Sequence, residues 1–80
     1  MARGSVIGRQ VAIMQATLEG DQPSLSDLAE RADLPLSTTH RLVGNLCAQG
    51  LLRKTPWLTY LPGSRLLELV DTGVQRARSG

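Results

Sequence analysis

The sequence is poor in aromatic residues and in cysteine. Its 80 residues include no phenylalanine, one tryptophan, one tyrosine and a single cysteine, Cys47. One cysteine excludes an internal disulfide, and one cysteine with one histidine falls short of the ligand set of a structural zinc site. No apolar run approaches the roughly 18 residues of a membrane-spanning helix, and residues 1–5 lack the apolar core of a signal peptide. The sequence therefore predicts a reduced, cytoplasmic domain with no metal, no cofactor and no membrane partner.

The chain is also too short to enclose a deep catalytic cleft. Eighty residues form a single domain with a thin core, supplied here mostly by 14 leucines. The sequence contains no Ser–His–Asp grouping at a plausible spacing and no glycine-rich phosphate loop. We therefore do not expect an enzyme.

Acidic side chains are absent from the middle of the chain. Residues 1–33 carry a net charge of −2, residues 34–67 carry +4 without any Asp or Glu, and residues 68–80 are neutral. An acid-free basic segment inside a chain of mixed charge indicates contact with an anionic partner. The alternative is a chance cluster of four solvated cations. These four residues are Arg41, Arg53, Lys54 and Arg65.

Apolar periodicity predicts a first helix over about residues 5–19. Its buried face is expected to be one stripe, with Ile13 on an adjacent stripe. The members of the stripe are Ile7, Val11, Met14 and Leu18. After a turn, Ser24 is expected to cap a second helix of two turns, because Asp27 stands three residues later as in a capping box. Pro35 ends this second helix, since the residue before a proline avoids the α conformation.

A third helix is expected over about residues 36–49, because proline is tolerated just before a first helical turn. Cys47 falls on its inner face and is expected to be a buried, unreactive thiol. The outer face carries short hydroxyls near the helix start and longer polar side chains one turn later. This outer set is Ser37, Thr38, His40, Arg41 and Asn45. Such side chains suit base edges in a DNA major groove, and no carboxylate is present to repel phosphate.

A β-hairpin is expected after the third helix. Residues 51–54 and 58–61 are short strand candidates on either side of a proline-containing turn. Pro62 lacks a backbone N–H, so the second strand should be short. Arg53 and Lys54 stand on the first strand, where basic side chains reach phosphates or the minor groove.

The predicted order is helix, helix, helix, hairpin, helix. Two helices joined by a short turn, the second polar on its outer side, form a helix-turn-helix, and the hairpin adds a wing. The sequence therefore predicts a mostly α fold with a small β-hairpin, a winged helix-turn-helix. The domain is placed at residues 5–71, and residues 72–80 are expected to be a linker-like C-terminal tail.

Several segments of the sequence together point to one known family. They are residues 34–46 with Gly50-Leu51-Leu52, residues 9–14, and residues 60–69. These segments resemble the recognition helix, the first helix, and the wing exit with its following helix in the N-terminal domain of IclR-type transcriptional regulators. The resemblance implies a DNA-binding winged helix-turn-helix. The family usually has an arginine where this chain has Leu61, so the phosphate contact that this arginine implies is lost here.

The resemblance also implies partners for the domain. It implies binding to a pseudo-palindromic operator in double-stranded DNA as a homodimer, through the first helix and a C-terminal domain that also senses a small-molecule effector. We expect Ile7, Arg9 and Ile13 to be candidate dimer contacts on the first helix. The effector-sensing domain is expected to lie outside these 80 residues.

Two questions stay open at this point. A winged helix can also serve as a protein–protein interaction module that never reads DNA, although the acid-free segment at residues 34–67 argues against it. Trp57, in the turn of the hairpin, has three possible positions: packed onto the core, in contact with the DNA backbone, or exposed. We expect packing, because an exposed tryptophan promotes association.

Overall fold

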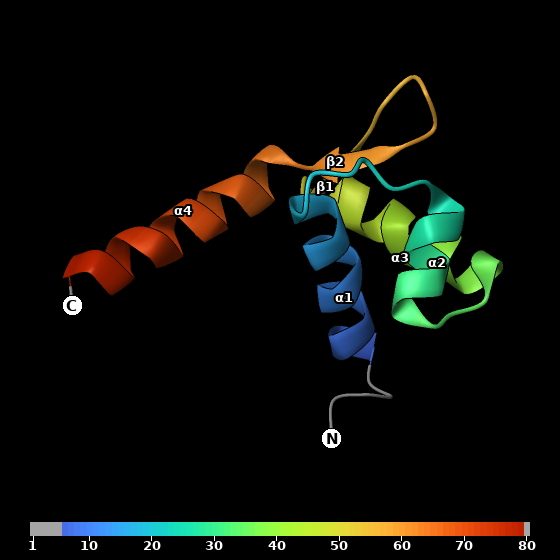
Figure 1. Cartoon of the computed structure of the whole chain (residues 1–80), viewed down its shortest axis with the longest axis horizontal. Coiled ribbons are helices and arrows are strands. Elements are labelled where there is room, and N and C mark those ends of the chain that lie inside the picture. The colour runs from blue at the N-terminus through green and yellow to red at the C-terminus, as the bar shows by residue number, and fades with distance from the viewer. Residues whose placement is uncertain (1–5, 80) are drawn as a thin grey trace.

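The chain folds into a three-helix body with a β-hairpin at one end and a fourth helix that projects away from it (Figure 1). The structure, a computed structural model, describes the backbone of residues 6–79 and the side chains of residues 7–73. Its elements in chain order are α1 (Val6–Leu18), α2 (Leu25–Ala32), α3 (Leu36–Ala48), β1 (Leu52–Lys54), β2 (Tyr60–Pro62) and α4 (Ser64–Ser79). This order confirms the predicted mostly α winged helix-turn-helix. Within residues 6–79, no helix combines the length and the apolar character that crossing a membrane requires.

One hydrophobic core joins the three helices of the body to the hairpin. Ile13 of α1, Leu28 of α2 and Val43 of α3 are its most buried large side chains. Leu52 and Tyr60 close the core from the hairpin. Because each helix contributes one face to this core, the opposite face of α3 is left outward.

Helix α1 buries Ile13, Ala16 and Thr17, which lie three and four residues apart on one face. The Thr17 hydroxyl donates a hydrogen bond to the Met14 carbonyl oxygen at 2.7 Å, so this polar side chain is buried with a partner. Helix α1 packs against α2 and β2. Ile13 is therefore a core residue, and the prediction that it contacts a second subunit is wrong.

The apolar stripe that was predicted to be buried in α1 lies largely on the outside. Ile7 is 73% exposed, Val11 41% and Leu18 38%, while Met14 is half-buried against the core. The prediction is wrong because two neighbouring stripes of α1 are apolar, and periodicity alone does not say which one meets α2. We call Ile7, Val11 and Leu18 the outer α1 surface.

Both ends of α2 are defined by local backbone and side-chain contacts. Ser24 Oγ accepts a hydrogen bond from the Asp27 N–H at 3.2 Å, and the Asp27 carboxylate accepts one from the Ser24 N–H at 3.0 Å. This completes the predicted capping box. At the other end of α2, Asp33 takes the left-handed conformation at φ 55°, and Leu34 is buried in the turn. Pro35 is already the N-cap of α3, so one helix ends and the next begins within a few residues.

Strands β1 and β2 pair antiparallel, with Leu52 opposite Pro62 and Lys54 opposite Tyr60. The second strand is short as expected, with 3 residues, but it begins at Tyr60 instead of residue 58 and includes Pro62 as its last residue. The backbone N–H of the buried Tyr60 donates to the Pro23 carbonyl oxygen at 2.9 Å. The hairpin is thereby joined to the turn between α1 and α2.

Gly63 lies where two backbone segments meet. A Cβ atom at this position would lie 2.8 Å from the Gly50 carbonyl carbon and 2.9 Å from the Leu51 carbonyl carbon. The Gly63 N–H itself donates to the Leu51 carbonyl oxygen at 2.9 Å. Any side chain at this position would push the end of the hairpin away from the end of α3. The glycine therefore sets the point at which α4 leaves the body.

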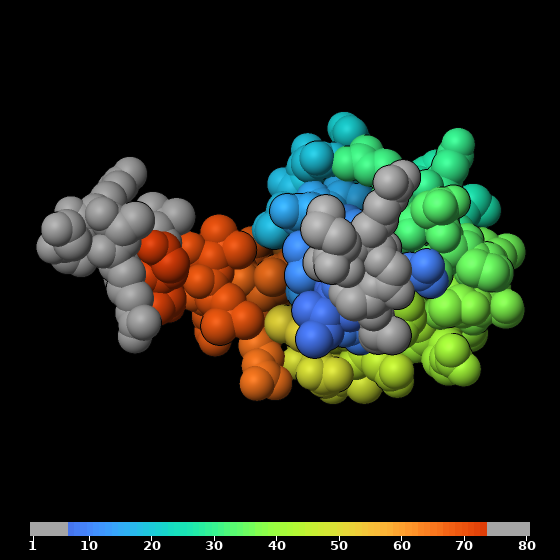
Figure 2. All heavy atoms as spheres, turned by 90° about the horizontal axis from the view of Figure 1, so that it is seen from below, coloured from blue at the N-terminus to red at the C-terminus, as the bar shows by residue number. Residues whose placement is uncertain are grey.

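Helix α4 is joined to the body through its first turn, where Leu66 is buried. Figures 1 and 2 show the helix leaving the three-helix body. It continues to Ser79, so residues 72–79 of the expected tail are helical. The division into domain and tail at residue 71 stays a prediction. Up to Gly73, where the description of side chains ends, the exposed large apolar side chains of α4 are Leu67, Leu69 and Val70.

Candidate nucleic-acid interface

Helix α3 has one buried face and one exposed face. The buried residues are Thr39, Leu42, Val43 and Leu46. Of the residues predicted to contact DNA, Thr38 is half-buried and the others on this helix are exposed: Ser37, His40, Arg41 and Asn45. Residues at spacings of three, four and eight share one side of a helix. The structure therefore brings the predicted α3 residues together on one surface, which we call the outer α3 face.

The first turn of α3 is open to an anion. Its N-cap is Pro35 and no side-chain hydrogen bond caps the helix, so Ser37 and Thr38 lie within the first turn and not at the cap. The fully buried Thr39 hydroxyl donates to the Pro35 carbonyl oxygen at 3.0 Å. The first N–H groups of a helix have no intrahelical partner and carry partial positive charge. The hydroxyls of Ser37 and Thr38 lie at this positive end.

Small residues occupy the middle and the end of the outer α3 face. A Cβ atom added at Gly44 would meet no atom within 4 Å, and Ala48 is exposed. A helix surface without large side chains lets the backbone approach the floor of a groove closely. Sequence reasoning gives these two residues no role, because a missing side chain leaves no chemical signal.

Arg53 and Lys54 are both exposed on β1, but they point to opposite sides of the hairpin, since successive strand residues alternate between faces. Arg53 lines a shallow cavity of about 360 Å³ with Ser64 and Leu67 at the start of α4. Lys54 lies toward Cys47 at the end of α3. Burial raises the pKa of the Cys47 thiol, and the charge of Lys54 partly offsets that effect. The two predicted wing cations therefore face different surroundings.

Cys47 itself is only half-buried. It packs against the core from the inner side of α3, although the sequence predicts full burial. It lies in the last turn of α3, near Lys54 of β1 and Tyr60 of β2. The raised thiol pKa is consistent with the predicted low reactivity.

Arg65, the fourth cation of the acid-free segment, is engaged within the fold. Its Nη1 donates to the Gln49 carbonyl oxygen at 3.4 Å, and its backbone N–H donates to the Gly50 carbonyl oxygen at 3.1 Å. A cation at the C-terminal end of a helix is favoured by the helix dipole, so Arg65 stabilises the end of α3. The cations of this segment that remain for an anionic partner are Arg41, Arg53 and Lys54.

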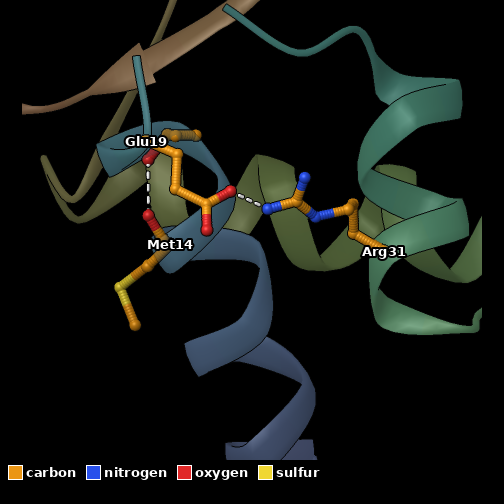
Figure 3. Close-up of polar contacts among 4 residues, drawn as sticks. Met14, Glu19 and Arg31 are labelled. Atoms are coloured by element: carbon orange, nitrogen blue, oxygen red, sulfur yellow. Dashed lines mark hydrogen bonds and ion pairs between the residues drawn. The ribbon is translucent and has the colours of Figure 1, made fainter. Parts of the chain in front are cut away.

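Acidic side chains collect elsewhere, around α1 and α2. Asp21, Asp27 and Glu30 line an open cavity of about 440 Å³. Nearby, Glu19, directly after α1, forms an ion pair with Arg31 of α2 (Figure 3). The charge separation in the sequence is therefore kept in space, with the acids on the α1–α2 side and an acid-free outer α3 face.

Comparison with known proteins decides the family. The model of the IclR helix-turn-helix domain matches residues 6–56. The chain belongs to this family. The IclR family consists of DNA-binding transcription regulators, so the outer α3 face lies on the helix-turn-helix of a DNA-binding module.

Among the solved structures that resemble this IclR domain, three illustrate the match. An IclR homolog from Microbacterium sp. strain HM58-2 shares 31% identity at a TM-score of 0.77, over 92% of this chain and 32% of that one. An IclR-family transcriptional regulator from Rhodococcus sp. shares 27% identity at a TM-score of 0.72, over 82% and 26%. An IclR homolog from Microbacterium hydrocarbonoxydans, complexed with 4-hydroxybenzoate, shares 34% identity at a TM-score of 0.60, over 75% and 27%. The chain thus spans a third or less of these relatives, and none of the curated proteins compared with it matches.

The wing tip of this IclR domain differs from the prediction. Trp57 was expected to pack onto the core, but it is 78% exposed, and Leu58 beside it is 66% exposed. Leu52 and Tyr60 close the core at this end, so the tip lies beyond it. Leu58 has a left-handed φ of 62° and therefore belongs to the turn, not to the predicted second strand.

Proposed function

We propose that this IclR domain binds double-stranded DNA sequence-specifically in the cytoplasm and thereby regulates transcription. Helix α3 would lie in the major groove with its outer face against the bases. The observation that carries the proposal is the outer α3 face itself, which is largely exposed, free of carboxylates and held in place by the buried side of the helix.

The proposed contacts follow from the position of each side chain along α3. Ser37 and Thr38, at the positive end of the helix, bind a backbone phosphate. Arg41 projects from the middle of the outer face, where its planar guanidinium can fork onto the O6 and N7 atoms of a guanine. Asn45, one turn later, has the donor and acceptor that adenine requires, and His40 lies at the edge of the same face.

The hairpin is proposed to fix the register of the helix on the duplex. Arg53 and Lys54 point to opposite sides of β1, so they bind different phosphates rather than one. Such contacts carry no base information, but they set the orientation in which α3 enters the groove.

Tight binding is proposed to require two copies of the domain. Three available cations give one copy a weak hold on DNA, and two copies on a pseudo-palindromic operator would place their α3 helices about one helical turn apart. The outer α1 surface, where Ile7 is 73% exposed, is the proposed part of the dimer contact within this chain, next to the half-buried Arg9. Any small-molecule effector is proposed to act through residues outside these 80.

Selection from random DNA tests the proposal. A forced dimer of the domain, made with a flexible linker, is used to select bound duplexes from a random pool. The account predicts enrichment of a motif with dyad symmetry and half-sites about one turn apart. If the forced dimer retains duplex DNA but no motif is enriched, sequence-specific binding is contradicted. Failure to retain duplex DNA at low salt would instead support a protein-interaction module.

A further inference from the structure

The tip of the wing exposes two large apolar side chains next to each other. Trp57 is 78% exposed and Leu58 66% exposed, and neither belongs to the core. Figure 1 shows the loop that carries them extending from the hairpin, away from the helices. Apolar area of this size in contact with water is unfavourable, and a contiguous exposed pair often marks a contact with a partner.

The exposure does not come from a loose loop. The Thr55 N–H donates to the Thr59 carbonyl oxygen at 2.9 Å, and the Leu58 N–H donates to the Thr55 carbonyl oxygen at 3.2 Å. The Thr55 hydroxyl lies 2.7 Å from the Thr59 hydroxyl and accepts from the Trp57 N–H at 3.2 Å. These bonds close the turn around the side chain of Thr55, so the tip has a defined shape before any partner binds.

Leu58 occupies a position at which glycine is the favoured residue. Its φ is 62°, the left-handed conformation that closes a three-residue hairpin loop. A leucine there costs conformational free energy, and its side chain projects to solvent rather than into the core. Backbone strain that brings no packing inside the fold is typical of a functional position.

The charge around the tip favours DNA as the partner. Arg53 and Lys54 lie on the strand that leads into the loop, and no acidic residue occurs in residues 34–67. A narrow hairpin tip that carries apolar side chains next to two cations of the preceding strand matches a minor groove, whose walls are deoxyribose and whose rims are phosphate.

We propose that Trp57 and Leu58 are themselves DNA contacts of the wing, with both side chains packed against deoxyribose and base edges in the minor groove beside the segment bound by α3. This inference rests on the proposed function. Apolar side chains inserted into a minor groove open and bend the duplex in other DNA-binding proteins. The tip would therefore add both affinity and a preference for deformable flanking sequence.

Tryptophan fluorescence tests this placement, because Trp57 is the single tryptophan of the chain. The 80-residue chain is titrated at low salt with random-sequence duplexes, and acrylamide quenching is measured at each step. We expect Trp57 to be strongly quenched in the unbound chain and protected in the complex. Duplexes with inosine in place of guanine, which lack the amino group in the minor groove, should bind a few-fold more tightly.

Variants separate the tip contact from folding. Trp57→Ala should weaken binding about tenfold, and its affinity should no longer respond to inosine. Leu58→Gly should weaken binding by a smaller factor while the thermal midpoint stays equal or rises, because the strain at φ 62° is relieved. Leu69→Ala, which removes an exposed leucine from α4, is the matched control and should leave affinity unchanged.

Three outcomes would overturn the inference, and they are distinguishable. Binding with Trp57 still fully quenched, or with Trp57→Ala at wild-type affinity, would place the tip outside the groove and leave the proposed function intact. Protection of Trp57 by raised protein concentration alone would assign the tip to a second copy of the chain. Absence of binding to any duplex would overturn the proposed function together with the inference.

Discussion

The two helices of the helix-turn-helix, α2 and α3, use the same residue types for different purposes. Ser24 caps α2, whereas Ser37 of α3 lies on an exposed face after an N-cap that makes no side-chain bond. Arg31 of α2 pairs with Glu19, whereas Arg41 of α3 makes no hydrogen bond or ion pair among the described residues. The polar groups of the first half therefore stabilise the fold, and those of the second half remain available to a partner. Substitutions matched across the two halves test this difference.

The largest effect is expected for the two arginines. Arg41→Ala should lower the affinity for the selected operator by about 1–3 kcal/mol, because a base or phosphate contact is lost. Arg31→Ala removes the same charge from the α1–α2 side and should change affinity far less. Anisotropy titrations at one fixed salt concentration compare them. Equal losses for both variants would show that only net charge matters.

The next effect concerns the open middle of the outer α3 face. Gly44→Leu should weaken DNA binding about tenfold by holding the helix away from the groove floor, while stability rises by about 0.5–1 kcal/mol through helix propensity. Gly73→Leu on α4 is the matched control, since a Cβ atom there also meets nothing within 4 Å. It should stabilise the chain without affecting affinity. An unchanged DNA affinity of the Gly44→Leu variant would show that α3 does not lie in the major groove.

A smaller pair of effects is expected for the two serines. Ser24→Ala should cost about 1 kcal/mol of stability through loss of the capping box and leave DNA affinity unchanged. Ser37→Ala should do the reverse, with unchanged stability and a measurable loss of affinity. Urea unfolding and DNA titration on the same samples decide this. A loss of stability in Ser37→Ala would mean that this hydroxyl supports the helix start.

The smallest expected effect is a loss of folding stability at high pH, caused by two groups between α3 and the wing. Burial raises the pKa of the Cys47 thiol, and burial with the nearby thiol raises the pKa of Tyr60. Both groups lose their protons more readily in the unfolded chain. The free energy of unfolding is therefore undiminished below their ordinary pKa values and decreases as the pH rises from these values toward the raised pKa values of the folded chain. Urea unfolding between about pH 8 and pH 10.5 should show this decline, first from the thiol. Cys47→Ala should delay it, and a stability that rises over this range would contradict the burial of both groups.

The sequence predicts the helix-turn-helix well because its boundaries depend on local chemistry. The Ser24–Asp27 capping box and the proline that starts α3 each act within a few residues, so pattern and structure agree. The two faces of α3 were also predictable, since Arg41 and Asn45 stand on the one polar side of a helix whose other side is apolar. The same local signals place Arg53 and Lys54 on the first strand of the wing.

Features that depend on distant packing were not predictable in this way. Helix α1 carries two apolar stripes, and only contact with α2 and β2 decides that Ile13 is buried and Ile7 is exposed. Trp57 is a large apolar residue of the kind expected in a core, but Leu52 and Tyr60 already close the core at the hairpin, and Trp57 lies outside it. The engagement of Arg65 with the end of α3 likewise depends on the return of the chain through Gly63.

The salt dependence of DNA binding tests the central claim that α3 and the wing form one polyanion-binding surface. With Arg53 and Lys54 each neutralising a phosphate, and Arg41 bound to a base, a plot of log K against log salt should have a slope of about −2 per domain. Joint replacement of Arg53 and Lys54 by alanine should make the slope shallower by about 2. A wild-type slope near zero, unchanged by that replacement, would contradict the account.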